Sequence, residues 1–229
     1  MEKFKLTLSL IVIALFICCK KNTEHINVDD TSTPAKNNGG GSQSQPSNAT
    51  YYAKGKLDGV SFIWEVTDNH DSYSFGSSAS SSFENGIAIG GVSGSISKII
   101  TNQMIQPVLD VEFKTMRVSY LEDKFTYLKS FITEGNWTFD TTDSYLVGSK
   151  NLRIKYVNKD GKVYFSSKGI QTGSTASVIS TKVVPEQLGI PPSLDVKVSI
   201  SCKLYPEDGT GNAVILTDAE LSLNIFNMI

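Results

Sequence analysis

Two tryptophans and an asparagine are the residues of this chain whose types and positions best fit the recognition of a sugar. Trp64 follows Phe62 at the two-residue spacing of a strand, and Trp137 directly follows Asn136. A flat indole face can cover the C–H patch of a sugar ring while a neighbouring amide bonds its hydroxyl groups. Trp64, Asn136 and Trp137 are therefore the candidate ligand-binding residues. For each tryptophan we expect core packing instead, in which an aromatic side chain buries about 150–250 Å².

Two pairs of acidic residues have a spacing that places both carboxyl groups on one face of a strand. Asp110 and Glu112 form one pair, and Asp218 and Glu220 form the other. Glycoside hydrolysis uses two carboxyl groups about 5–10 Å apart across a cleft, and like charges at that distance raise the pKa of one partner. For both pairs we expect a solvated strand face rather than a catalytic site. Because no motif fixes a cleft, we predict a protein that is not an enzyme and has no catalytic residues.

The sequence contains no strong motif for a metal site or a phosphate-binding site. The two histidines are too few for a histidine-rich zinc site, and neither residues 68–71 nor residues 207–212 match the calcium loop of an EF-hand. Turn-forming residues explain both runs, although a weak calcium site at the second stays open. The serine-dense residues 72–83 contain no nucleophile elbow, and residues 90–94 lack a phosphate-binding lysine. We predict no metal and no cofactor.

Length and charge bound the remaining classes of function. The chain has 229 residues, 40% of them apolar, and a net charge of −2 from 21 basic and 23 acidic residues. This composition is that of an ordinary globular domain. A nearly neutral chain lacks the positive field that attracts phosphate backbones, so we predict no nucleic-acid partner.

The N-terminus has the pattern of a secretion signal that ends in a lipidation site. Two lysines precede the apolar residues 6–17, which are followed by Cys18 and Cys19. An apolar run of this length is too short to cross about 30 Å of hydrocarbon as a helix. A small residue followed by cysteine resembles the bacterial lipobox, so we predict a signal peptide at residues 1–18 and diacylglycerol with palmitate-like acyl chains on Cys19. A plain signal peptide that is cleaved elsewhere is the alternative.

A polar tether separates this anchor from the rest of the chain. Residues 19–50 contain few apolar side chains and are rich in Asn, Ser, Gly and Thr, so they cannot bury enough surface to fold alone. Such a tether reaches on the order of 30 Å from the bilayer. The remaining cysteine, Cys202, alternates with apolar residues and has no cysteine partner, which predicts a buried free thiol rather than a disulfide.

Residues 51–229 read as one β-rich domain. Short β-type runs are separated by turn sequences, the pattern of antiparallel hairpins rather than of βαβ units. The turns lie at residues 58–59, 85–86, 158–161 and 207–212. Residues 119–132 instead have a capping-box start and apolar residues at helical spacing. We predict an all-β fold, either an antiparallel β-sandwich or a partly open barrel, with one short helix near residues 119–132.

The order of these segments resembles a broad family of uncharacterised Bacteroidota outer-membrane and cell-surface lipoproteins. The segments that carry the resemblance are residues 125–131, 135–139, 154–156, 160–167, 177–180, 196–205 and 214–223. The resemblance implies a lipobox and tether before an opening hairpin at residues 51–64, and a closing pair at residues 202–223. Ala219 stands where the pattern has a glycine. The family brings no catalytic residues.

These features lead to one expectation about function. We predict a lipid-anchored, non-catalytic protein of the outer membrane, on its cell-surface or periplasmic side, that binds a glycan or another envelope protein. Its membrane contact is the lipid on Cys19. A structural subunit of an envelope complex, with no small ligand, is one alternative, and a glycoside hydrolase is another.

Overall fold

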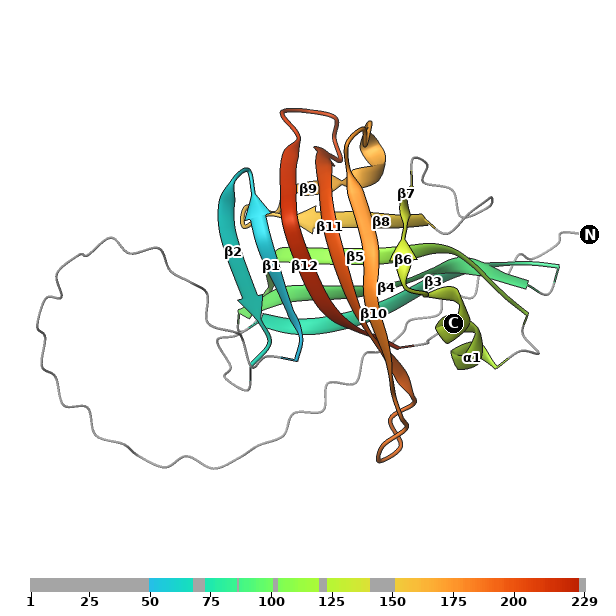
Figure 1. Ribbon diagram of the computed structural model, residues 1–229. Coiled ribbons are helices and arrows are strands. Elements are labelled where there is room, and N and C mark those ends of the chain that lie inside the picture. The colour runs from blue at the N-terminus through green and yellow to red at the C-terminus, as the bar shows by residue number, and fades with distance from the viewer. Residues whose placement is uncertain are drawn as a thin grey trace, which may run out of the picture. The chain divides into compact units, whose positions relative to one another are not determined.

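The computed structural model describes residues 50–67, 73–85, 87–100, 103–119, 123–140 and 151–226. Most of these residues lie in antiparallel strands, and one α-helix is present among them (Figure 1). The strands are β1 (Tyr52–Leu57), β2 (Val60–Glu65), β3 (Tyr73–Glu84), β4 (Ile87–Ile100), β5 (Gln103–Ser119), β6 (Gly135–Asn136), β7 (Thr138–Phe139), β8 (Asn151–Val157), β9 (Val163–Phe165), β10 (Thr175–Val184), β11 (Ser193–Pro206) and β12 (Val214–Phe226). The helices are α1 (Lys124–Phe131) and the 3-10 turn η1 (Ser166–Lys168). The predicted all-β fold with one short helix is confirmed.

The strands form one curled sheet with two halves. Its order is β2-β1-β12-β11-β9-β8-β5-β4-β3, with β10 beside β11, β6 beside β10 and β7 beside β8. The first half-sheet contains β2, β1, β12, β11, β10 and β6, and the second contains β9, β8, β7, β5, β4 and β3. Strand β11 joins the halves, because its last residues, Tyr205 and Pro206, pair with β9. In Figure 1 the strands of the first half run upright and those of the second run across them.

The core lies between the two halves. Strand β11 shows the alternation clearly, because Val196, Val198 and Ile200 are buried while the residues between them face the other way. Strand β4 approaches β12 closely at Gly94, where an added Cβ would lie 3.0 Å from the Cβ of Leu223. A side chain there would push the two halves apart, so glycine permits their contact.

The four predicted hairpin turns are confirmed by the pairing of the strands around them. They join β1 to β2, β3 to β4, β8 to β9 and β11 to β12. The first turn contains Asp58 and Gly59, both at positive φ (50° and 80°). A two-residue hairpin needs this conformation, and the Asp-Gly sequence adopts it with little strain.

The start of the predicted helix is wrong. Residue Ser119 ends β5, where it pairs with Ile87, so the capping box is not used. The helix begins instead at Lys124, and the carboxylate of Asp123 accepts from the backbone N–H of Phe125 and Thr126, each at 3.2 Å. A hydrogen bond from the hydroxyl of Thr126, together with these two backbone hydrogen bonds, lowers the pKa of Asp123. The long β5 extends into the sequence that the local pattern assigned to the helix, while residues 120–122 lie outside the described residues.

Candidate functional site

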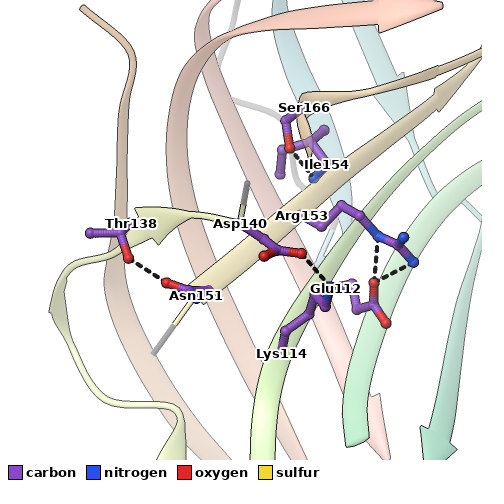
Figure 2. Close-up of polar contacts among 8 residues, drawn as sticks. All are labelled: Glu112, Lys114, Thr138, Asp140, Asn151, Arg153, Ile154 and Ser166. Atoms are coloured by element: carbon purple, nitrogen blue, oxygen red, sulfur yellow. Dashed lines mark hydrogen bonds and ion pairs between the residues drawn. The ribbon is translucent and has the colours of Figure 1, made fainter. Parts of the chain in front are cut away.

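A charged cluster covers the face of β5 and β8 that points away from the core. On β5, Leu109, Val111 and Phe113 belong to the core, so the alternate residues Asp110, Glu112 and Lys114 lie on the opposite face. Their register partners on β8 are Lys155, Arg153 and Asn151, in the same order. Figure 2 shows the centre of this cluster.

One ion pair of the cluster is buried. The Nζ of Lys114 donates to Oδ2 of Asp140, and the two side chains are only 1% and 4% exposed. The short strand β7 positions Asp140, because it pairs parallel with β8 and the N–H of Asp140 bonds the carbonyl of Leu152 at 2.9 Å. A buried charge is tolerated only when it is paired, so removing either group would be strongly destabilising.

A second ion pair joins β5 to β8. The Nε and Nη2 atoms of Arg153 both lie 2.7 Å from Oε2 of Glu112 (Figure 2). The guanidinium also lies 5.1 Å from the centroid of the Phe165 ring. Nearby, the hydroxyl of Ser166 accepts from the N–H of Ile154 at 2.9 Å and fixes the 3-10 turn against β8. The expected solvated face is wrong for Glu112, which is 7% exposed.

Asp110 is the chemically distinctive member of the cluster. Its Oδ1 atom has no hydrogen-bond partner among the described residues. Burial is the main reason that its pKa rises to about 6, and the charge of Glu112 adds to the rise. A hydrogen bond from Ser93 and the charge of Lys155 act in the opposite direction. This carboxyl group therefore has a buried acceptor atom that no described residue uses.

A row of small side chains lies beside Asp110 on the same face. We call it the serine strip, and it consists of Gly76, Ser78 and Ser80 of β3 with Gly91, Ser93 and Ser95 of β4. The hydroxyls of Ser78 and Ser93 lie 2.9 Å apart. Ser95 is the register partner of Asp110. Because glycine and serine barely rise above the backbone, this part of the sheet presents hydroxyl groups without bulky side chains.

The structure places both candidate ligand-binding tryptophans in the core. Trp64 is 6% exposed and stacks on Tyr73 at 5.3 Å. Trp137 is 5% exposed, packs edge-on against Phe113 at 5.0 Å, and donates its indole N–H to the carbonyl of Thr133 at 3.1 Å. Neither indole offers a free face, which is the core packing expected for each.

Asn136 lies on the first half-sheet and not on β5 or β8. It is exposed and belongs to β6, where it pairs with Ser177 of β10. The other acidic pair also lies elsewhere: the Asp218 side chain is 72% exposed and pairs with Lys56 at 3.0 Å. Glu220 accepts a hydrogen bond from Tyr52 and pairs with Lys54 at 3.2 Å.

Sequence reasoning did not find Lys114, Asp140 or Arg153 as members of a site. Charged residues that alternate with apolar ones on a strand normally face water, and nothing local distinguishes a buried Lys114. The parallel pairing of β7 that delivers Asp140 is long-range information. The one available signal was the Asp110 and Glu112 spacing, which correctly places both on one strand face.

The loop at residues 207–212, where the sequence left a weak calcium site open, has the hydrogen bonds of an ordinary turn. Asp208 accepts from the N–H of Thr210 at 2.8 Å, as in an ordinary turn. The ammonium of Lys162 donates to the carbonyl of Thr210 at 2.8 Å, so a cation already lies against the loop. In the part of the chain that the structure describes, no three acidic, histidine or cysteine residues gather as a metal site. Residues 68–71 lie outside that part.

Cys202 is a buried free thiol, as predicted. Burial raises its pKa, so the reactive thiolate is disfavoured.

Among the described residues no helix has the length and apolar character needed to cross a bilayer. No family model, curated protein or solved structure matches the chain.

Proposed function

We propose that this chain is a lipid-anchored, non-catalytic protein of the bacterial outer membrane, whose folded domain binds a hydroxyl-rich ligand such as a glycan. The binding surface is the serine strip together with Asp110. The observation that carries this proposal is the Oδ1 atom of Asp110, which bonds no described residue and lies beside the serine hydroxyls. A buried acceptor without a partner is unfavourable, and a ligand hydroxyl would satisfy it once the small side chains around Asp110 shift to admit the ligand to Oδ1.

The chemistry of this surface fits a sugar better than an apolar ligand. Serine hydroxyls can donate and accept, the Asp110 carboxylate accepts, and Lys155 donates. The exposed Ser78 lets a flat polymer approach β3, while the buried Ser93 links Ser78 to Asp110. Hydrogen bonds to a charged acceptor are worth about 1.5–3 kcal/mol each, so Asp110 would dominate the binding energy.

The membrane anchor is inferred from the first residues of the chain. A basic start, an apolar core and Cys19 form one continuous signal, and acyl chains on a terminal cysteine suffice to hold a domain on a bilayer. Mass spectrometry of the mature N-terminus tests this inference. We expect an acylated Cys19 as the first residue, and an unmodified N-terminus at another residue would contradict it.

A hydrolytic role for Asp110 and Glu112 is less favoured. Glu112 is held by two guanidinium nitrogens of Arg153 and is 7% exposed. A nucleophile or base must reach its substrate, and this carboxylate is already occupied. Release of reducing ends from a polysaccharide by the wild-type chain, abolished in Asp110→Asn, would overturn the non-catalytic proposal.

Retention on a panel of immobilised polysaccharides tests binding. The full chain, purified in detergent, is compared with Asp110→Asn and with Asp218→Asn, which changes an exposed acid elsewhere. Loss of a charged hydrogen bond predicts at least about tenfold weaker retention for Asp110→Asn and wild-type retention for Asp218→Asn. Circular dichroism confirms that each variant is folded. No retention across the panel, or equal retention by both variants, would contradict the proposed surface and favour a protein partner or a structural role.

A further inference from the structure

The hairpin between β10 and β11 ends in an exposed apolar tip. We call residues 183–192 the finger, and it extends beyond the rest of the sheet at the lower end of Figure 1. Leu188 is fully exposed (103%), Ile190 is 56% exposed and Val183 is 40% exposed. Exposed apolar side chains are ordinary when scattered, but a group of them at one projecting tip indicates a contact surface.

The conformation of the tip shows that the fold does not require leucine there. Leu188 and Gly189 have φ values of 51° and 79° and form a two-residue turn closed by hydrogen bonds between Gln187 and Ile190 of 3.2 and 2.8 Å. Asn or Gly suits the first position of such a turn, whereas leucine is strained at positive φ and, fully exposed, gains no packing. A strained residue with no structural benefit is a reason to look for a function.

The backbone of the finger suits an environment that is poor in water. The two closing hydrogen bonds satisfy donors and acceptors inside the turn. Pro185, Pro191 and Pro192 have no N–H, so three further donors are absent. An unsatisfied backbone group is costly in hydrocarbon, and this tip has fewer of them than an ordinary loop. A single acid, Glu186, lies behind the apex, where it could stay among headgroups.

The finger projects from the end of the sheet at which the tether enters the domain. Strand β11 begins at Ser193, directly after the finger, and Tyr51, the first residue before β1, donates to Asp195 at 3.0 Å. Thr50 accepts from Ser222 at 2.8 Å on the neighbouring β12. The residues that connect Cys19 to the domain therefore end close to the base of the finger.

We propose that the tip of the finger, Leu188 with Ile190, inserts into the outer edge of the bilayer that holds the anchor, and so orients the domain on that membrane. This inference rests on the proposed lipid anchor. One leucine and one isoleucine would bind a membrane weakly on their own. The tether keeps the finger within reach of the surface, which raises its effective concentration and makes a weak contact sufficient.

Fluorescence quenching in vesicles tests the insertion. The full acylated chain carrying Leu188→Trp is reconstituted into phosphatidylethanolamine and phosphatidylglycerol vesicles with brominated acyl chains, which quench only an indole in contact with them. Ile170→Trp is the matched control, because Ile170 is 75% exposed and accepts from Tyr205 at the opposite end of β11. The wild-type chain gives the signal of the two native, buried tryptophans.

We expect at least twofold stronger quenching, after subtraction of the wild-type signal, for Leu188→Trp than for Ile170→Trp. Equal quenching of the two variants in chains that sediment with the vesicles would overturn the insertion and leave the anchor intact. A chain that does not sediment with vesicles at all would instead show failure of the anchor. Leu188→Trp without quenching, but with cross-links from residue 188 to a cell protein, would also overturn it and assign the finger to a protein pocket.

Discussion

The Lys114–Asp140 pair and the tip of the finger invert the usual distribution of residues in opposite ways. Charged Lys114 is buried completely, whereas apolar Leu188 is exposed completely. The buried charge depends on its partner, because an unpaired ammonium in the interior is strongly unfavourable. The exposed leucine depends on nothing in the fold. The first inversion is therefore structural, while the second is the feature that the proposed insertion of the finger into the bilayer would explain.

Removing one partner of the buried pair should have the largest effect on stability. Lys114→Ala leaves Asp140 buried without its cation, and we expect a loss of about 3–5 kcal/mol in the free energy of unfolding, measured with urea. Lys54→Ala is the control, because the Lys54–Glu220 pair lies at the surface, with side chains 48% and 30% exposed. It should lose no more than about 1 kcal/mol. Similar losses for both variants would show that burial does not decide the role of the lysine.

Removing a core tryptophan should cost nearly as much. Trp137→Ala deletes the contacts with Phe113 and Phe131 and the hydrogen bond to Thr133. We expect a loss of about 3–4 kcal/mol, detected as a lower midpoint of thermal unfolding. Val60→Ala, at a site that is 72% exposed, should leave the midpoint nearly unchanged. An unchanged midpoint in Trp137→Ala would show that this indole does not stabilise the core, and would make it a candidate ligand contact.

The buried carboxyl group of Asp110 should make stability depend on pH. Its folded pKa of about 6 lies above the ordinary value of 3.8, so the folded state binds more protons than the unfolded state between about pH 4 and pH 6. Stability should therefore fall as the pH rises through this window, by on the order of 3 kcal/mol. Urea unfolding at several pH values measures the effect, and Asp110→Asn should flatten this part of the profile. An unchanged slope in that variant would assign the dependence to other groups.

Changing the apex of the finger should have the smallest effect on stability. Leu188→Asn relieves the strain of a leucine at positive φ, so we expect no loss and a gain of up to about 1 kcal/mol in the free energy of unfolding. The same variant removes the apolar contact that the finger offers. A destabilised Leu188→Asn chain, in the urea assay used for Lys114→Ala, would show that the leucine serves the fold after all.

Local sequence signals predicted most of the hairpins and the presence of one helix. The start of that helix and the buried ion pair depend on pairing between strands that are distant in the sequence. Turn chemistry such as Asp58-Gly59 predicts a hairpin because the conformation is set by two residues. The helix begins at Lys124 and not at the capping box because β5 extends through Ser119, which pairs with Ile87 of β4. The burial of Lys114 also depends on a distant strand, β7, which brings Asp140 to it. Neither the β4–β5 pairing nor the approach of β7 to Lys114 can be predicted from the residues nearby in the sequence.

The anchor on Cys19 is the premise of both the proposed function and the inserted finger, so membrane fractionation of cells tests the account most directly. The wild-type chain, Cys19→Ala and Cys18→Ala are expressed in bacteria that process lipoproteins, and the membrane and soluble fractions are compared. We expect wild type and Cys18→Ala to stay with the membrane and Cys19→Ala to be released. Retention of Cys19→Ala in the membrane fraction, at the wild-type level, would contradict the account.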